Sequence, residues 1–453
     1  MNPIDASRLW TPAGWQRDRR LHVATDGRIG STEHAGGGEA WVVPGIANLH
    51  SHAFQRAMAG LAERRGDATH GDPANDSFWT WRETMYRFAA RIGPESLHAI
   101  ACQLYVEMLE AGYTSVCEFH YLHHAPDGQT YAEAATMSHA LIAAARDTGI
   151  RLTLLPVLYM TGGFDGRELS PRQRRFGHRV DAYLHLLDTL AEDSGDAVRI
   201  GVALHSLRAV PPRAMAEVLA AIPPAMPVHV HIAEQVAEVD ECVAVRGARP
   251  VQWLLDNAAV DWRWTLVHAT HLDDAEVQGI AGSGATVAIC PTTEANLGDG
   301  LFPLRAYLDA GGAWGIGSDS HVSVSPVEEL RWLEYGQRLQ ARQRNIAASG
   351  DGASVGDTLL AGVIASAQHA TGHATGALVD GAFADAVVLD TGAPAFAGLH
   401  ERDAIDRWVF NGNRNLVRDV LVGGVRVVEG GRHRDRDAIA ARFGATMGEL
   451  LRD

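Results

Sequence analysis

Short apolar stretches rich in β-branched residues recur along most of the chain, each bounded by turn-forming residues. A run of about four to eight such residues between turn signals predicts a buried strand. The eight runs are 41–49, 115–119, 151–158, 198–204, 228–232, 264–267, 286–289 and 314–316. Helix-like stretches lie between most of them, for example 95–110, 132–146 and 212–221. Eight strands alternating with helices predict a (β/α)8 TIM barrel.

The two ends of the chain depart from this alternation. Residues 1–43 and 376–435 contain short strand-like pieces separated by glycine turns. We expect these two segments to pair into one small β-sandwich domain built from both termini. The metal-dependent barrel would then occupy residues 44–375. Residues 436–453 would form a C-terminal helix, because apolar positions recur there with a helical period.

Two connections are longer than is usual between the elements of a barrel. Residues 53–92 include the tryptophan-containing sequence DSFWTWRETMY, and residues 161–179 include the basic sequence RQRRFGHR. Long loops that follow barrel strands lie on the catalytic face. We therefore expect both connections to contact the substrate or to cover it.

Histidines and acidic residues stand at the ends of four predicted strands. In chain order they are His50 and His52 (first strand), His231 and Glu234 (fifth), His268 (sixth) and Asp319 (eighth). The first pair has the i, i+2 spacing that points both side chains to one face, and strand ends of this kind meet at one mouth of a barrel. Three histidines and one carboxylate suit zinc, with a position left for water. We predict one divalent ion bound by His50, His52, His231 and Asp319. The ligand types favour Zn²⁺, and a site of this kind also takes iron or another divalent ion.

The other histidines near strand ends are interpreted as structural. His229 shares a strand face with His231 but lies deeper, so we expect a core or supporting role. His271 and His321 fall beyond the strand ends and are expected in loops. The histidines within 120–124 follow the second strand; one of them can touch substrate, but solvated loop positions are the simpler expectation.

The amino-acid composition excludes several classes of function. All 39 basic residues are arginine, which excludes a lysine Schiff base, a P-loop lysine and a lysine general base. A formal net charge of −16 argues against nucleic acid or an anionic membrane as a partner. The four cysteines are far apart and form no CxxC pair, so a disulfide framework is not expected. Neither a membrane-length apolar run nor a secretory signal is apparent, and we expect a cytoplasmic protein.

These residues resemble those of the amidohydrolase superfamily. The resemblance rests on His-Ser-His after Pro44 and Gly45, on the strand-five His-x-x-Glu, on the strand-six histidine and on the strand-eight aspartate, and it extends to residues 381–390 near the C-terminus. Binuclear members of the superfamily usually bridge two metals with a carboxylated lysine. This chain has no lysine, so the resemblance implies a mononuclear site of the deaminase type.

A narrower resemblance is to the N-formimino-L-glutamate deiminase (iminohydrolase) family. It is carried by residues 50–58, 77–82, 118–121 and 205–208. It implies hydrolysis of N-formimino-L-glutamate to N-formyl-L-glutamate and ammonia in histidine degradation, by a homodimer. It also implies that the substrate is contacted by Gln55, Arg82, Tyr121, His205 and Arg208. Arginine forks bind carboxylates in a bidentate manner, so Arg82 and Arg208 fit a dicarboxylate substrate.

The residue types also suggest how the reaction proceeds. Zinc lowers the pKa of a bound water from 15.7 towards about 7, which supplies hydroxide for attack on the formimino carbon. We expect Asp319 and His268 to orient this water and accept its proton, and Glu234 to hydrogen-bond the nitrogen end of the amidine. The general base is either Asp319 or His268, because metal and side chains titrate as a coupled set.

Two other functions fit parts of the sequence. A mononuclear deaminase of a ring amidine, such as guanine or an adenosine-type nucleoside, would share every metal residue. A neutral ring, however, needs no pair of guanidinium groups. A non-catalytic scaffold with the same barrel would be expected to lose ligands, whereas all six metal and catalytic positions are occupied here.

Overall fold

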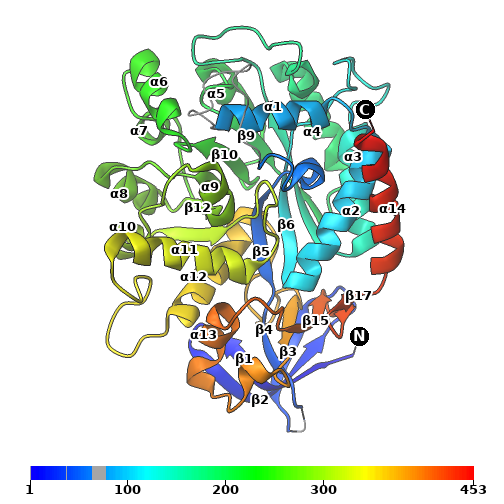
Figure 1. Cartoon of the computed structure of the whole chain (residues 1–453), viewed down its shortest axis with the longest axis vertical. Helices are drawn as coiled ribbons and strands as arrows, with labels where there is room; N and C mark the ends of the chain where they lie inside the picture. Colours follow the sequence, from blue (N-terminus) through cyan, green and yellow to red (C-terminus); the bar gives the residue numbers. More distant parts are fainter. Residues whose placement is uncertain (1, 37, 64–77, 453) are drawn as a thin grey trace.

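The computed structural model describes residues 2–36, 38–63 and 78–452, which form a barrel with a smaller sheet at one end (Figure 1). Apolar side chains of the barrel strands and of the surrounding helices merge into one large buried core. A smaller core, which includes Leu9, Leu21 and Val42, lies within the second sheet. Within the described ranges, no helix is long and apolar enough to cross a membrane.

The barrel consists of parallel strands that follow one another around the sheet. They are β5 (Ile46–Ser51), β6 (Tyr113–His120), β7 (Arg151–Leu158), β9 (Val202–Ser206), β10 (Val228–Ile232), β11 (Trp264–His268), β12 (Thr286–Ile289) and β13 (Ala313–Ile316), with the short β8 (Val198–Ile200) paired beside β7. The ends of the sheet meet where the backbone nitrogens of Ser318 and Asp319 both donate to the His50 carbonyl, at 3.1 and 3.0 Å. The predicted (β/α)8 barrel is confirmed.

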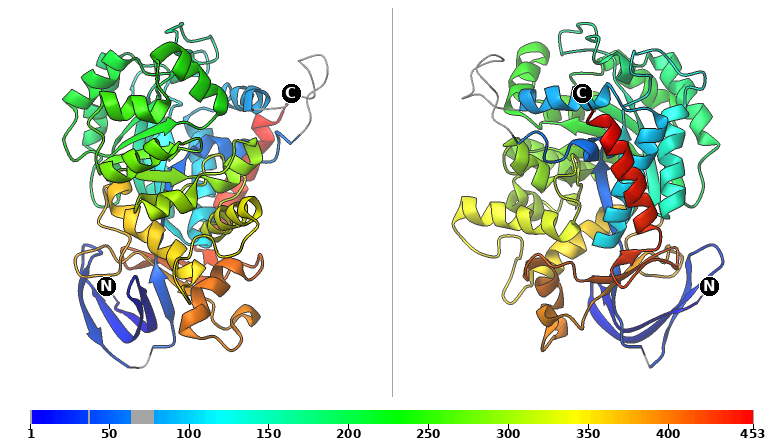
Figure 2. Two further views of the ribbon diagram at one scale, coloured as in Figure 1. Left: turned by 90° about the vertical axis from the view of Figure 1, so that its left-hand side faces the viewer. Right: turned by 45° about the vertical axis from the view of Figure 1, so that its right-hand side comes forward.

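Helices surround the strands on the outside of the barrel (Figure 2). They are α2 (Pro94–Ala111), α3 (Thr136–Thr148), α4 (Val180–Ala191), α5 (Pro212–Ala221), α6 (Val236–Arg246), α7 (Pro250–Asn257), α8 (Asp274–Ser283), α10 (Leu304–Asp309), α11 (Pro326–Ala341) and α12 (Val355–Thr371). The short helix α9 (Pro291–Leu297) follows β12 at the mouth of the barrel. Local sequence signals set several of their ends. At α8, Asp273 and Glu276 form a reciprocal capping box, which satisfies two backbone donors of the first turn.

The second sheet takes strands from both ends of the chain. Its order is β17 (Arg432–His433), β16 (Val425–Glu429), β15 (Val417–Val422), β14 (Ala386–Leu389), β4 (Trp41–Pro44), β1 (Ile4–Thr11), β2 (Gly14–Val23) and β3 (Ile29–His34). The expected pairing of the terminal segments is therefore present, as one continuous hydrogen-bonded sheet of eight strands. The short helix α13 (Ala404–Phe410) precedes β15, and the last helix, α14 (Arg436–Leu450), packs along α2 (Figure 1).

The first predicted strand, 41–49, is not one strand. Residues of β4 pair with β14 in the small sheet, whereas β5 belongs to the barrel, and the change occurs at Gly45. A Cβ at this position would lie 2.2 Å from the Thr114 side chain, so only glycine allows the chain to pass there. A continuous apolar run does not reveal that its two halves enter different sheets. The fourth predicted strand is also two strands, β8 and β9, but both of these pair with β7 in the barrel sheet.

A buried ion pair connects the small sheet to the barrel and provides a test of the fold. Asp385, just before β14, accepts two hydrogen bonds from Arg151 at the start of β7, at 2.9 and 3.0 Å, and both side chains are almost completely buried. Removing one partner leaves the other charge buried and unpaired. We expect Asp385→Ala to lower the free energy of unfolding in urea by about 3–5 kcal/mol.

The control is Asp196→Ala, which removes the half-exposed carboxylate partner of Arg28 at 3.3 Å. Exposed ion pairs contribute about 0–1 kcal/mol, so this variant should unfold near the wild-type urea concentration. Equal and small losses in the two variants would contradict a stabilising role for the Arg151–Asp385 pair.

A candidate metal centre and its substrate cavity

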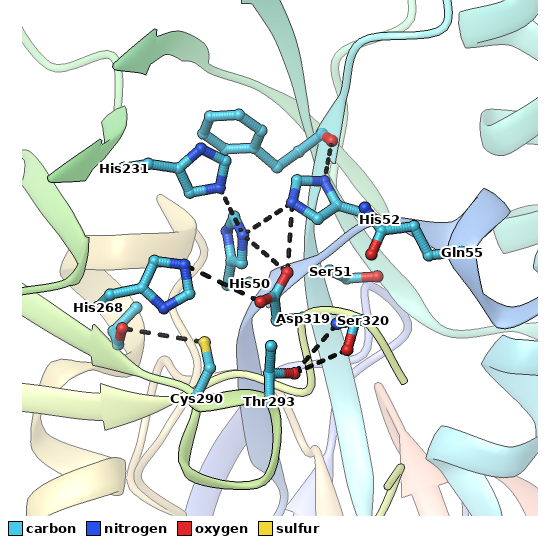
Figure 3. A network of polar contacts seen from close by, with 12 residues as sticks. His50, Ser51, His52, Gln55, His231, His268, Cys290, Thr293, Asp319 and Ser320 are labelled. Atoms are coloured by element: carbon cyan, nitrogen blue, oxygen red, sulfur yellow. Dashed lines mark hydrogen bonds and ion pairs between the residues drawn. The ribbon is translucent and has the colours of Figure 1, made fainter. Parts of the chain in front are cut away.

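The four side chains predicted to bind metal converge at one mouth of the barrel (Figure 3). The His50 Nε2 atom lies 3.1 Å from His52 Nε2 and 3.0 Å from His231 Nε2. The Asp319 Oδ1 atom lies 3.3 Å from His52 Nε2 and 3.5 Å from His50 Nε2. All four side chains are buried. Gly317, one residue after β13, allows this approach, since a Cβ there would lie 2.7 Å from the His50 Cβ.

The chemistry of these donors fits a divalent cation. The Nδ1 atoms of His52 and His231 face the carbonyl oxygens of Phe119 and His205, at 2.8 and 2.9 Å. A carbonyl only accepts, so each Nδ1 carries the proton and each Nε2 presents a lone pair to the centre. Burial is the main cause that lowers the pKa values of the three clustered histidines, which keeps them neutral. Facing lone pairs beside a carboxylate repel one another unless a cation lies between them.

His268 lies beside this ligand set. Its Nε2 atom is 3.9 Å from both Glu234 Oε1 and Asp319 Oδ2, and its Nδ1 atom is 3.4 Å from Glu294 Oε1. Burial by itself would lower the pKa of His268, but the negative charge of Glu234 and hydrogen bonds that include Glu294 raise it well above its ordinary value. Burial raises the pKa of Glu234. The arrangement therefore places two groups that can exchange a proton next to the metal ligands.

Glu294 was not identified from the sequence. It lies in α9, on the connection that follows β12, and its Oε1 atom also accepts a hydrogen bond from the Cys290 backbone at 2.9 Å. The signal that the sequence offered was an acidic residue shortly after the seventh predicted strand. Its contact with His268 fixes the orientation of that ring, which is a supporting role that the sequence pattern does not reveal.

The backbone around the centre adopts a conformation that non-glycine residues rarely use. Positive φ angles occur at Ala233 (51°), His268 (68°), Ala269 (48°), Asp319 (43°) and His321 (63°). Each such residue costs about 1–3 kcal/mol unless its surroundings hold it. At Asp319 two backbone hydrogen bonds stabilise this conformation. Its nitrogen donates to the His50 carbonyl, and its carbonyl accepts from the His52 nitrogen at 3.2 Å. These turns aim the strand-end side chains into the mouth.

A cavity of about 60 Å³ opens beside the candidate metal ligands. Its lining includes all five residues expected to contact substrate, namely Gln55, Arg82, Tyr121, His205 and Arg208. Gln55 lies in a 3-10 turn after β5, η1 (Ala53–Met58), and its Nε2 atom donates to the Tyr121 hydroxyl at 2.8 Å. Arg82 lies in α1 (Phe78–Ala89), and its Nη2 atom donates to the Tyr159 hydroxyl at 3.1 Å. The structure thus brings the substrate residues of four separate segments together.

Both long connections reach this cavity. Trp81 and Met85 line it from the connection 53–92, and Phe176 lines it from η3 (Arg174–Phe176) in the connection 161–179. Part of the first connection, residues 64–77, lies outside the described residues, including the beginning of the DSFWTWRETMY sequence. Tyr159 and Leu297 also line the cavity and were not singled out from the sequence. Neither has a neighbouring motif that would have marked it.

The expectation of solvated histidines after the second strand was wrong. His120, His123 and His124 are buried, and the rings of His123 and His124 lie 4.4 and 4.8 Å from the ring of His178. The connection 161–179 folds back over them, which a reading of each loop by itself does not predict. His321 is likewise buried, between Ser51 and Ser318. By contrast, His229 is the core histidine expected, bonded to the Ala370 carbonyl at 2.9 Å.

Comparisons with known proteins agree with this geometry. The family model described as "Amidohydrolase family" matches residues 41–427. A curated formimidoylglutamate deiminase from Pseudomonas aeruginosa is 51% identical over 460 residues, with all of both chains covered. An 8-oxoguanine deaminase from the same organism is 26% identical over 421 residues, which cover 90% of this chain and 87% of the relative.

Solved structures give the same result for the fold. A crystal structure of an amidohydrolase from Brucella melitensis is 45% identical and superposes with a TM-score of 0.93 over all of both chains. An adenosine deaminase from Xanthomonas campestris, solved with bound zinc, is 21% identical and superposes with a TM-score of 0.81 over 99% of this chain and 98% of that one. The second similarity concerns the fold alone.

Proposed function

This chain belongs to the amidohydrolase family, and we propose that it hydrolyses N-formimino-L-glutamate to N-formyl-L-glutamate and ammonia with the help of one zinc ion. The chain is a hydrolase of carbon–nitrogen bonds. The observation that carries the choice of substrate is the full-length 51% identity to a formimidoylglutamate deiminase, together with two arginines in the cavity beside the histidine cluster. A dicarboxylate needs such groups, because guanidinium forks pair with carboxylates.

The metal would be held by His50, His52, His231 and Asp319 and, when bound, would lower the pKa of a water molecule towards about 7. The Asp319 carboxylate lies 3.9 Å from His268 Nε2, so that either group would be within reach of the proton removed from the attacking water. Burial favours the protonated form of Glu234, so its carboxyl group can deliver a proton to the nitrogen that leaves as ammonia.

The remaining cavity residues bind and orient the substrate. Arg82 and Arg208 supply positive charge, while Gln55 and Tyr121 supply a hydrogen-bonded polar pair in the same cavity. The apolar walls, which include Phe176 and Leu297, exclude water from the charged groups and so strengthen their interactions. Binding of this kind lowers KM without entering the bond-breaking step.

A deaminase of a ring amidine is the alternative, favoured by the 26% identity to an 8-oxoguanine deaminase. The zinc-loaded protein should be incubated with N-formimino-L-glutamate, guanine and adenosine while ammonia release is measured. Ammonia from the formimino compound alone is expected. Ammonia from a ring substrate alone would contradict the proposed substrate and retain the hydrolase.

Arg208 gives a sharper test of substrate binding. Arg208→Ala removes one of the cavity's two guanidinium groups, and we expect KM for N-formimino-L-glutamate to rise at least about tenfold with a smaller change in kcat. The matched control is Arg213→Ala in α5, where the side chain is exposed. An unchanged KM in Arg208→Ala would remove this residue from the binding set.

We infer two properties of the protein in the cell from the same family. The substrate places the enzyme in histidine degradation, in the cytoplasm. Dimers are common among its relatives, so we expect a homodimer, which light scattering of the purified protein would test.

A further inference from the structure

The hydroxyl group of Tyr159 occupies a point where three side chains from separate segments meet. Tyr159 follows β7, is 1% exposed, and packs the edge of its ring against His205 with the ring centres 4.3 Å apart. Around its oxygen lie Arg82 from α1, Gln173 from the connection 161–179, and Arg208 from the segment after β9. The reaction described above assigns no role to this tyrosine.

The Tyr159 oxygen is surrounded by donors. Gln173 Nε2 donates to it at 2.9 Å and Arg82 Nη2 at 3.1 Å, while the positive charge of Arg208 also acts on it. A phenol oxygen has two lone pairs and one proton of its own. The two donors therefore use both of its lone pairs. The hydrogen bond from Arg82 fixes that side chain in the cavity that Arg208 also lines.

The charges at this point are unusual for a buried phenol. Burial by itself would raise the pKa of Tyr159, but the positive charges of Arg208 and Arg82 outweigh burial and lower it. Tyr86, which also lies beside Arg82, behaves in the opposite way, and burial raises its pKa to about 12. The two arginines therefore outweigh burial at the Tyr159 oxygen but not at the Tyr86 oxygen.

Neighbouring hydrogen bonds hold both arginines in place. Gln173 is itself fixed, because its Oε1 atom accepts from the Ser170 nitrogen at 2.9 Å. Arg208 is fixed at its backbone, where its carbonyl accepts from the Thr161 hydroxyl at 3.1 Å. An arginine side chain that is free to move loses rotamer entropy when it binds a ligand. Contacts that already fix the side chain before binding remove part of that cost.

We propose that Tyr159 is a positioning residue that holds the guanidinium group of Arg82 beside Arg208, so that the two arginines form one clamp for a single carboxylate of the substrate. The inference rests on the proposed function and refines it. Because Arg82 is bonded to Tyr159 and Arg208 lines the same cavity, both guanidinium groups reach one carboxylate, and the second carboxylate of the substrate binds elsewhere in the cavity. Tyr159 thereby sets which end of a dicarboxylate the arginines recognise.

Tyr159→Phe tests the clamp, because it removes the oxygen that fixes Arg82 and retains the ring. The substrates are N-formimino-L-glutamate and two analogues that each lack one of its carboxylates. We expect KM for the full substrate to rise about 10- to 100-fold, the effect of losing a hydrogen bond to a charged group, with kcat within about threefold of wild type. The rise should vanish with one analogue and persist with the other. Equal rises with both analogues, or a loss confined to kcat, would overturn the proposal.

Tyr183→Phe is the matched control. Tyr183 is also fully buried near β7, and its hydroxyl donates to the Pro156 carbonyl at 2.8 Å, away from the arginines. We expect this variant to lose thermal stability without a change in KM. If both variants raise KM alike, Tyr159 acts through general packing, and the clamp is rejected.

A binding measurement separates this inference from the proposed reaction. Calorimetry with the metal-loaded protein and L-glutamate, a simple dicarboxylate, requires no turnover. Weaker binding to Tyr159→Phe by about tenfold or more supports the clamp even if wild type releases no ammonia from the formimino compound, in which case the reaction alone fails. Equal binding by wild type and variant rejects the clamp even if the reaction is correct.

Discussion

Asp319→Asn should lower kcat for deimination by at least about 10³-fold while the protein stays folded. The carboxylate lies 3.3–3.5 Å from two histidine nitrogens of the cluster and 3.9 Å from His268 Nε2, so in the proposed reaction it would serve both the metal and the proton taken from water. Asparagine keeps the shape but neither accepts that proton nor supplies the negative charge. It also tolerates the left-handed backbone at this position, where φ is 43°.

Three measurements make this result interpretable. The variant should show the circular dichroism of wild type, its metal content should be determined, and single-turnover ammonia release should be followed. The control is Asp357→Asn, which changes a carboxylate near the start of α12 that accepts from Trp10 Nε1 at 2.8 Å, far from the mouth. Turnover near that of wild type in Asp319→Asn would refute its role.

Removal of the metal with a chelator should abolish activity, and one equivalent of Zn²⁺ per chain should restore it. The tautomers of His52 and His231 leave lone pairs that face one another and the carboxylate, so the metal-free cluster is strained by its own repulsion. Because the cluster exists only in the folded chain, metal binding should also raise the melting temperature in a concentration-dependent manner. Full activity of the chelated protein would contradict a metal-dependent reaction.

A second group of potential ligands must be distinguished in that experiment. His98, Cys102 and Asp147 lie together on the outer helices, with the His98 and Asp147 side chains 3.0 Å apart. His98→Ala should leave the stoichiometry of tightly bound metal and the activity unchanged. His50→Ala should lose both. The opposite pattern would assign the bound metal to the outer group.

Much of the architecture follows from short-range pattern. Buried parallel strands must be continuously apolar, so the runs at 151–158 and 228–232 identify β7 and β10 from the sequence, with the same boundaries. The i, i+2 spacing of His50 and His52 requires one shared face, and the barrel topology brings strand ends together. The resemblance to amidohydrolases, in a chain without lysine, then leads us to expect a mononuclear metal site.

Long-range packing determined the rest. Gly45 separates two sheets because of the Thr114 side chain, which lies 69 positions further along the chain. The buried histidines at 120–124 are covered by a distant loop, and the left-handed turns at His268 and Asp319 exist because neighbouring strands hold them. Tyr159 belongs to the same class, since its partners come from three other segments. Periodicity reports which side of an element faces the core, but it carries no information about which distant side chains meet there.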